Sequence, residues 1–571
     1  MKEWRIKKTA DKDKINELSK ILNIDKTLAN LLLQRGIDNF DKAKKFFRAN
    51  LNDLYDPFLM KDMDIAVERI NKAIKNNEKV LIYGDYDVDG TTSVAIMFTF
   101  LKDYLPNIDF YIPDRYNEGY GISYKSIEYA DTNKFNLVIA LDCGIKAIEK
   151  INLANKKQID YIICDHHNPG NEIPKAIAVL DPKRKDCNYP FKDLSGAGVG
   201  FKLLQALSIK NNYNKNKLFE LLDLVTISIA SDIVPIVDEN RILASYGLKI
   251  INTNPRQGIK SIIKTSGLSK KNIIISDIVF KIGPRINAAG RIKDAKDSVN
   301  VLISDNVNDA EKFANIINEH NKNRQDLDKD ITKQALDLIN NNLELQNRKT
   351  TILYNESWSK GVIGIVASRL MEHYYRPTII FTKSNNILTG SARSVQGFDL
   401  YDALDKCSHL FVSFGGHKYA AGVSIKPEDF DEFNDTFEKV VSETITNDNL
   451  IQKIDVDSVI DFDEITPSFF NILKQLCPFG PENMTPVFVS RNVTDNGYSK
   501  LVGADKTHLK LSIFQKSNNK IMDGIAFGMG KYLDDIKKNN NFDICFNIEE
   551  NNFMNRKTLQ LMVRDIKINN A

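Results

Sequence analysis

The chain has 571 residues, which at about 150 residues per domain suggests three to four domains, each able to bury a core. With 42% hydrophobic and 27% charged residues it is not a disordered or low-complexity sequence. No apolar run approaches the roughly 18 residues that span a bilayer, and the first residues lack the apolar core of a secretory signal. Six scattered cysteines without C-x-x-C spacing argue against a disulfide framework or zinc site, so we expect a cytoplasmic protein with no membrane partner. The net charge of only +3 argues neither for nor against nucleic acid.

Residues 1–50 predict an N-terminal segment of short polar-rich helices. From about residue 78, apolar runs alternate with helical or turn segments, which is the pattern of βαβ units and a mainly parallel sheet. The expected strands are 80–83, 109–112, 137–141, 161–163 and 177–180. We expect helices at 93–104 and 218–231, with a polar surface loop at 211–217 between them. This α/β domain is predicted to span 51–300.

The second half of the chain changes character twice. Residues 306–342 carry apolar side chains at helical spacing and no Pro or Gly, so we expect a long linking helix within 301–345. A second α/β domain is predicted at 346–450. Residues 451–571 contain short strand-like runs separated by Asn, Gly and Asp turns, which favours a small β-barrel.

The sharpest local feature is the run Gly84 to Gly90, which holds three carboxylates at alternate positions, Asp85, Asp87 and Asp89. It follows a predicted buried strand and precedes a predicted helix. An acidic turn is the bland interpretation. An EF-hand loop does not fit, because the glycine offset is wrong and Ile96 stands where the closing Glu is needed.

Two later predicted strands also lead into acidic or histidine side chains. The run 137–141 leads into Asp142, and the run 161–163 leads through a cysteine to Asp165, His166 and His167. A further acid, Asp232, ends the predicted helix at 218–231, where a cap is as good an interpretation as a ligand. In an open parallel sheet, ligands bind beyond the carboxyl ends of the strands, so these side chains are expected to meet.

Carboxylates with one or two imidazoles and no thiolate favour Mn²⁺ or Mg²⁺ over zinc. Several carboxylates in one place stay ionised only if cations neutralise them. Two ions roughly 3.5–4 Å apart clamp a phosphate for in-line attack. The residues therefore predict metal-dependent hydrolysis of a phosphoester or phosphoanhydride.

Four motifs in this order resemble the DHH phosphoesterases: GDYDVDGTT (84–92), LDCG (141–144), DHH (165–167) and SDIVP (231–235). The likeness to the bacterial single-strand-specific exonucleases of that family covers nearly the whole chain. It continues in PDRYNEGYG (113–121), GPRINAAGR (283–291), GVIGIVASR (361–369), SARS (391–394) and FGGHKYAAG (414–422). The resemblance implies a parallel-sheet DHH catalytic domain, a long helix, a DHH-associated domain and a C-terminal oligonucleotide-binding (OB) fold.

The resemblance also implies roles for single residues. Asp85, Asp87, Asp142, His166 and Asp232 match the family's metal ligands, and Asp89 matches the third carboxylate of the first motif, as a ligand or as a ligand's partner. His167 would face the scissile phosphate, and Asp165 would orient His166 through its other ring nitrogen. Two local departures are Ser359-Lys360, where many relatives carry a His, and Pro481-Glu482 in place of a Gly-Asn-Pro-type turn.

The small net charge hides an uneven distribution. Residues 241–300 hold 12 Lys and Arg against 3 Asp, a charge of +9 that leaves −6 for the rest of the chain. A solvated surface is the usual meaning of such a run, but GPRINAAGR lies within it, and we predict DNA contacts for Arg285, Asn287 and Arg291. Arg115, Tyr116 and Tyr120 add a candidate phosphate contact and stacking surfaces. By resemblance, Arg393, Gly415, Gly416 and His417 hold the 5′-side nucleotides, although Gly415-Gly416 also fits a tight turn.

The resemblance implies a monomeric 5′→3′ exonuclease that degrades single-stranded DNA to mononucleotides in repair and recombination, with a helicase and a single-strand-binding protein as partners. Two alternatives remain at this point. One is a DHH-type hydrolase of short oligonucleotides, cyclic dinucleotides or pyrophosphate, against which the barrel and the basic window argue. The other is a degenerate relative that only binds DNA, against which the complete set of matched ligand positions argues.

Overall fold

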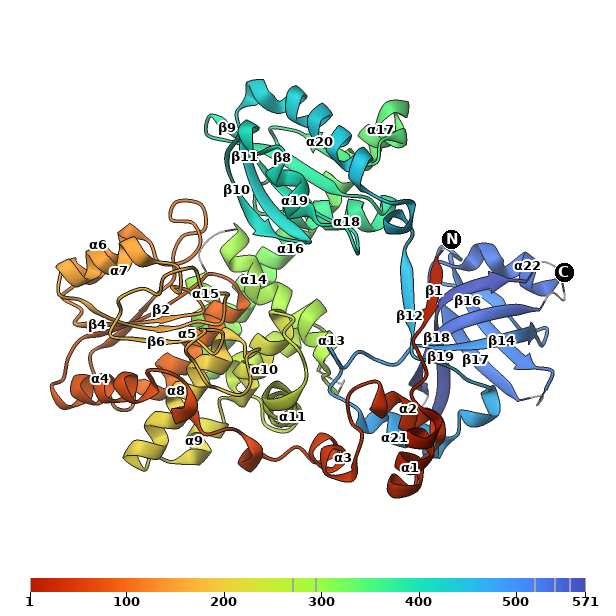
Figure 1. The fold of residues 1–571 in the computed structure, drawn as a ribbon, viewed down its shortest axis with the longest axis horizontal. Helices are drawn as coiled ribbons and strands as arrows, with labels where there is room; N and C mark the ends of the chain where they lie inside the picture. The colour runs from red at the N-terminus through yellow and green to blue at the C-terminus, as the bar shows by residue number, and fades with distance from the viewer. Residues whose placement is uncertain are drawn as a thin grey trace. The chain divides into compact units, whose positions relative to one another are not determined.

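The computed structural model describes residues 2–269, 272–292, 295–517, 520–538, 541–553 and 556–569. The chain forms two compact units, one of residues 54–234 and 238–452 and one of residues 1–53, 235–237 and 453–571. None of the described helices is long and apolar enough to cross a membrane. Figure 1 labels the elements.

Five parallel strands form the first sheet, in the order β3-β2-β4-β5-β6. They are β2 (Val80–Gly84), β3 (Ile108–Tyr111), β4 (Leu137–Leu141), β5 (Asp160–Cys164) and β6 (Ala178–Leu180), so every apolar run of the prediction is a strand. All residues of β2 and β4 are buried, as expected where helices cover both faces. Because the chain places β3 on one side of β2 and β4 on the other, the topological switch point lies between the carboxyl ends of β2 and β4.

Helices pack on both faces of this sheet (Figure 1). Side chains of α6 (Tyr124–Thr132) and α7 (Ile148–Lys156) share one core with alternate residues of β2, β4 and β5. Helices α5 (Val88–Leu101) and α8 (Gly196–Asn211) contact the sheet as well as each other. The remaining helices are α4 (Met63–Lys75), α9 (Lys215–Phe219), α10 (Leu222–Ser231), α11 (Asp238–Thr253), α12 (Gln257–Thr265), α13 (Ile275–Asp277), the π-helical turn Ile278–Ile282, α14 (Gly283–Ile292) and α15 (Lys296–Ile303).

Two sequence predictions need correction here. The helix expected from Ser93 begins five residues earlier, because the Asp87 side chain accepts the Gly90 N–H and caps the helix there. The segment 218–231 is two helices, and 211–217 is not one loop, because it holds the end of α8 and the start of α9. Asn212 in the left-handed region ends α8, and the Asn214 side chain caps α9.

The predicted long helix is α16 (Val307–Asn340), capped by Asn306. Its first half packs on α12, α14 and α15, and its second half packs on α18 (Ile363–Tyr374) of the next domain. That domain has a five-stranded sheet in the order β10-β11-β9-β8-β7, in which only β7 and β8 pair in parallel. Its elements are α17 (Leu343–Asn347), β7 (Thr351–Tyr354), β8 (Thr378–Ser384), β9 (Ile387–Arg393), α19 (Leu400–Asp405), β10 (Phe411–His417), β11 (Ala420–Ile425) and α20 (Phe430–Thr444).

The other unit contains the predicted barrel, in which β14 pairs with both β18 and β16. Its strands are β13 (Ser458–Val459), β14 (Phe488–Asp495), β15 (Lys500–Val502), β16 (His508–Gln515), β17 (Ile521–Ala526), β18 (Phe542–Phe553) and β19 (Arg556–Ile568), with α21 (Pro467–Gln475) and α22 (Leu533–Lys537). Leu28 and Leu31 of α2 (Lys26–Leu33) lie in the barrel core. The N-terminal strand β1 (Glu3–Ile6) pairs with β12 (Lys453–Val456), and α1 (Lys12–Leu22) and α3 (Phe40–Phe47) complete the unit.

Candidate active site

Acidic and imidazole side chains meet at the switch point of the first sheet. Asp85 follows β2, Asp142 follows β4, and the DHH triplet follows β5, so three adjacent strands deliver them to one edge. Asp87 and Asp89 stand at the start of α5. Asp232 directly follows α10, which packs on α5. The structure therefore brings these residues together at one edge of the sheet.

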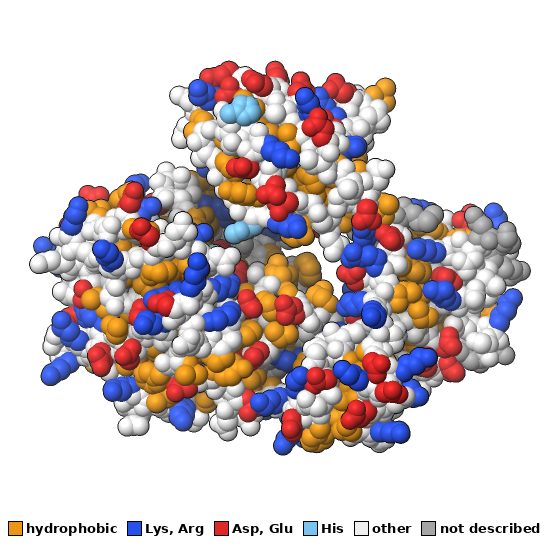
Figure 2. All heavy atoms as spheres, viewed as in Figure 1, with side chains coloured by type: hydrophobic (Ala, Val, Ile, Leu, Met, Phe, Trp, Pro, Cys, Tyr) orange, Lys and Arg blue, Asp and Glu red, His pale blue; other side chains and the backbone are white. Residues whose placement is uncertain are grey.

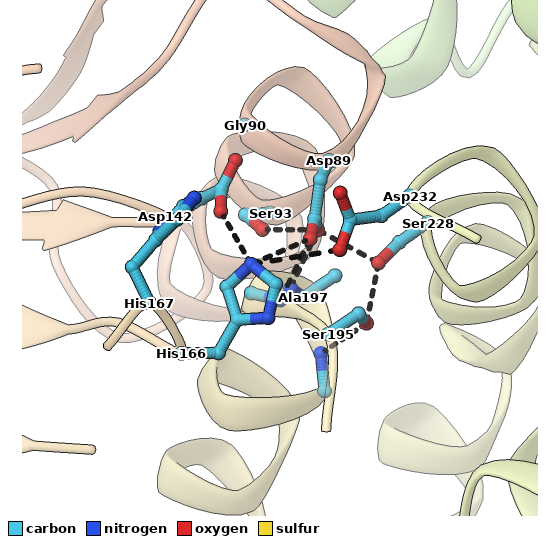
Figure 3. A network of polar contacts seen from close by, with 12 residues as sticks. Asp89, Gly90, Ser93, Asp142, His166, His167, Ser195, Ala197, Ser228 and Asp232 are labelled. Atoms are coloured by element: carbon cyan, nitrogen blue, oxygen red, sulfur yellow. Dashed lines mark hydrogen bonds and ion pairs between the residues drawn. The ribbon is translucent and has the colours of Figure 1, made fainter. Parts of the chain in front are cut away.

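His166 lies at the centre of this cluster. Its Nε2 is 3.2 Å from Asp142 Oδ1, 3.6 Å from Asp232 Oδ2 and 3.7 Å from Asp89 Oδ2. Figure 3 shows the ring between Asp142 on one side and Asp89 with Asp232 on the other. Two groups have all ligand atoms within 4.8 Å of one another, Asp142 with His166 and His167, and Asp89 with His166 and Asp232. Each group has the composition of a divalent-cation site.

Asp89 is buried and held in place by backbone and hydroxyl donors. Its carboxylate accepts hydrogen bonds from the Gly196 N–H at 2.7 Å and the Ala197 N–H at 2.9 Å, both at the start of α8. Ser228 of α10 donates a third bond at 2.7 Å. A helix amino terminus favours a negative charge, and these three donors hold the Asp89 carboxylate in place beside His166.

The cluster fits a divalent cation. Both carboxylate oxygens of Asp85 and the Nδ1 of His166 are buried and make no hydrogen bond with any described residue, which is costly for a polar atom unless a ligand satisfies it. Burial and then the neighbouring carboxylates raise the pKa values of Asp85 and Asp142, and they raise the pKa of Asp232 to about 8. Binding a cation removes both penalties.

Asp165 does not orient His166, so that prediction was wrong. Its Oδ1 lies 2.7 Å from Nδ1 of His167, and the carboxylate also accepts the N–H groups of Ile145, His166 and His167. Past the end of β5 at Cys164, the Asp165 carboxylate thus faces the imidazole two residues on and not that of its neighbour. Burial alone would lower the pKa of His167, but the bond to Asp165 outweighs it and raises that pKa.

Tyr120 closes the other side of His167. Its hydroxyl lies 3.1 Å from His167 Nε2 and donates to the Asp142 carbonyl at 3.1 Å. The tyrosine is 54% exposed and stands between Gly119 and Gly121, both with a positive φ that glycine tolerates best. The side chains of His167 and Asp232 are 40% and 30% exposed. We call the opening lined by Asp232, His167 and Tyr120 the mouth of the site.

Arginines from four segments gather beside this site. Burial and then the charges of Arg115, Arg324 and Arg393 lower the pKa of Arg291 to about 10. Arg115 stacks over the Tyr86 ring at 4.8 Å, and Arg291 Nη1 donates to the Gly361 carbonyl at 3.0 Å. A side chain at Gly361 would collide with the Arg291 carbonyl and the Tyr116 hydroxyl, so glycine is required there. We call Arg115, Arg291, Arg324 and Arg393 the arginine cluster.

The other residues predicted to contact DNA lie in different surroundings from one another. Arg285 donates to Asn318 and to the Lys281 carbonyl, and Asn287 Oδ1 is buried without a hydrogen bond to a described residue. Gly415 and Gly416 lie inside β10, not in a tight turn, because the reversal is at 418–419. His417 pairs with Ala420, which pairs with Arg393, so these side chains share one row of the second sheet. On the face in Figure 2, basic and acidic side chains are interspersed without a large patch of one sign.

Sequence reasoning missed Arg324 and Asp181. Arg324 lies on α16, which was interpreted only as a connection, and the charge of Arg369 also lowers its pKa after burial. Asp181 directly follows β6, the fourth strand end at this edge, and burial raises its pKa to about 7. Asp181 could have been predicted because ligands bind beyond the carboxyl ends of parallel strands, whereas no local motif marks Arg324.

Comparison with known proteins gives a consistent match. Three family models match the chain, described as the DHH family N-terminal domain at 79–229, the DHHA1 domain at 347–443 and the RecJ OB domain at 456–565. The single-stranded-DNA-specific exonuclease RecJ of Bacillus subtilis is 37% identical over 569 residues, covering 99% of this chain and 71% of that protein.

Solved structures agree at the level of the fold. RecJ from Thermus thermophilus in complex with Mn²⁺ has a TM-score of 0.85 at 22% identity, covering 100% of this chain and 80% of that one. The Mg²⁺ complex of the protein from the same source has a TM-score of 0.79, also at 22% identity, covering 100% and 79%. The architecture of a DHH domain, a long helix, a DHHA1 domain and an OB domain is thereby confirmed.

Proposed function

The chain belongs to the RecJ family of single-stranded-DNA-specific exonucleases, and from that premise we propose that it hydrolyses single-stranded DNA in a reaction that needs Mn²⁺ or Mg²⁺. The observation that carries this proposal is the His166-centred cluster at the switch point, with buried ligand atoms that lack partners. We extend it to 5′→3′ removal of mononucleotides during repair and recombination, in the cytoplasm, alongside a helicase and a single-strand-binding protein.

The residues divide the chemical work. Asp85, Asp87, Asp142, His166 and Asp232 would hold two ions, which when bound polarise the phosphate and supply a nucleophile at neutral pH. Asp89, held by the N–H groups at the start of α8, would act as a further ligand or as a partner of His166, 3.7 Å from its Nε2. A water oxygen bonds to phosphorus, the bond from phosphorus to the 3′-oxygen breaks, and the shortened strand keeps a 5′-phosphate.

His167 is the group placed to act on the leaving oxygen. It lines the mouth, its Nδ1 is held by Asp165, and its raised pKa favours a protonated ring near neutral pH. A protonated imidazole can stabilise the developing charge or give its proton to the 3′-oxygen. Tyr120 contacts the same ring and has to yield its place at Nε2 to the phosphate.

The arginine cluster supports binding of the strand. Its guanidinium groups repel one another, and this repulsion adds to burial in lowering the pKa of Arg291. A phosphate group placed among them relieves the repulsion and forms charge-assisted hydrogen bonds. Contacts to phosphate carry no sequence information, which suits an enzyme that degrades any single strand.

Removing a ligand tests this proposal. We expect Asp142→Asn or His166→Ala to abolish nucleotide release in Mn²⁺, because the cation site loses a central donor, while far-ultraviolet circular dichroism and affinity for single-stranded DNA stay close to those of the parent. Unchanged release would contradict the assignment. The same assay on a dinucleotide separates the substrate classes, since a strong preference for the dinucleotide would make the chain a short-oligonucleotide hydrolase instead.

A further inference from the structure

The residue after the metal-site acid Asp232 has an unusual backbone. Ile233 has a φ of 60°, and among the described residues it is the only β-branched one with a positive φ. A branched Cβ clashes with its own backbone in this region, so such a residue is a true outlier and not an ordinary turn residue. Asp142 at the same site has a φ of 59°, but aspartate tolerates the left-handed region far better.

The side chain of Ile233 is also unusually exposed. It is 63% accessible, whereas its neighbour Val234 and the preceding Ala230 of α10 are buried. The Asp232 N–H donates to the Ser228 carbonyl at 2.9 Å, so the segment is anchored to α10 up to Asp232. The fold thus keeps a strained backbone and an apolar side chain in water at one position. Strain of this kind persists where the surrounding structure enforces it, which is most often at a functional site.

Ile233 lies next to a residue that lines the mouth of the site. It directly follows Asp232, whose side chain is 30% exposed at the mouth and whose Oδ2 lies 3.6 Å from His166 Nε2. The buried half of the site holds Asp85, Asp89, Asp142 and His166, so a phosphate has to approach from the mouth. A sugar and a base flank any phosphate held there, and the exposed isoleucine supplies an apolar surface for a base or sugar face.

We propose that Ile233 is a positioning residue that packs against the nucleotide at the scissile linkage and holds its phosphate in line with the metal site. This inference rests on the proposed nuclease function and deepens it. Apolar packing is tolerant of sequence, because every base has an apolar face. Ile233 therefore selects for an unstacked nucleotide without selecting which base it is.

The test pairs a variant with a modified substrate. Ile233→Gly removes the side chain while keeping the backbone conformation, which glycine adopts readily. Gln158→Gly is the matched control, because Gln158 also has a positive φ of 60° and is exposed, but lies before β5 at the opposite edge of the sheet. Each enzyme digests a 5′-phosphorylated single strand that is either unmodified or carries one abasic nucleotide, placed in turn at each of the first few positions.

We expect Ile233→Gly to lower kcat/KM about ten-fold on the unmodified strand and Gln158→Gly to leave it unchanged. At one abasic position the parent enzyme should lose the same factor, and Ile233→Gly should lose nothing further. Mn²⁺ affinity should be the same in all three proteins. The proposal is overturned if Ile233→Gly matches the parent on the unmodified strand, loses as much as the parent at every abasic position, or loses Mn²⁺ affinity. A parent enzyme that releases no nucleotide from the unmodified strand would instead refute the proposed function.

Discussion

His167 has hydrogen-bonding partners on both ring nitrogens before any substrate arrives. Asp165 fixes Nδ1, and the Tyr120 hydroxyl lies at Nε2. The imidazole is therefore oriented by the protein and needs no rearrangement when a phosphate replaces the tyrosine hydroxyl. Carboxylate partners of this kind set both the orientation and the basicity of an imidazole.

Replacing the Asp165 carboxylate tests that role at the scale of one residue. We expect Asp165→Asn to lower kcat by about 10–100-fold, the usual cost of losing such a partner, with little change in KM. Because Asp165 raises the pKa of His167, the alkaline limb of the pH–rate profile should move to lower pH. Asp109→Asn, at an exposed position of β3, is the control. An unshifted profile would contradict the assignment of Asp165 to His167.

The sequence allowed most of the site to be predicted, since strand ends in a parallel sheet converge wherever the strands are recognised. It could not give the partner of Asp165, because that depends on how the backbone runs past the end of β5, where His167 lies in a bend. The place of Arg324 in the arginine cluster could not be predicted, for another reason. Its contribution depends on the packing of α16 against α14, and helical spacing alone does not say which polar residue of a long helix meets other arginines.

At the scale of elements, a fully buried ion pair joins α8 to α11. The Lys202 ammonium donates to Glu239 Oε1 at 3.0 Å and to the Tyr55 carbonyl at 2.7 Å, and Tyr189 donates to Glu239 Oε2 at 2.6 Å. Both charged side chains have 0% exposure. The pair matters for the site because the start of α8 supplies the N–H groups that hold Asp89.

Breaking this pair should be costly. We expect Lys202→Met to lower the free energy of unfolding by about 3–5 kcal/mol, since it leaves the Glu239 charge buried without its partner. Lys217→Met is the matched control, because Lys217 pairs with Asp103 at the surface and such pairs contribute about 1 kcal/mol or less. Urea unfolding followed by circular dichroism measures both. Equal losses in the two variants would show that the buried pair is not the element that fixes α8.

Helix positions were predictable where apolar spacing was regular, as in α16, and less so where polar caps decide. The start of α5 depends on the Asp87 side chain, and the break between α9 and α10 falls within a stretch of continuous apolar spacing. At α5 the side-chain cap sets a start that the periodic pattern does not mark, whereas α10 begins without a side-chain cap.

At the scale of the whole molecule, the net charge of +3 is small because basic and acidic side chains that gather at different sites cancel one another. Acidic side chains crowd the switch point and arginines crowd beside it, and each group is disfavoured until a partner of opposite charge binds. Burial of like charges makes the ligand-free protein less stable than its packing alone would allow.

The acid cluster gives a pH dependence with a defined sign. Asp232 has a pKa raised to about 8 in the folded protein, above its value in the unfolded chain. Its contribution to stability is therefore complete below about pH 4 and lost as the pH rises toward 8, by at most ~1.4 kcal/mol per pH unit. In a chelator we expect the unfolding temperature to fall over this range. Saturating Mn²⁺ should flatten the fall, and Asp232→Asn should reduce it without metal. A chelated protein that grows more stable toward pH 8 would contradict this assignment.

The most direct test of the central claim is digestion of single strands labelled at either end, with and without Mn²⁺ and beside a duplex control. We expect a 5′ label to be released at once as a mononucleotide. A 3′ label should stay on steadily shortening strands, and the duplex and the metal-free reaction should yield almost nothing. Equal digestion of the duplex, release of the 3′ label first, or unchanged release in a chelator would contradict it.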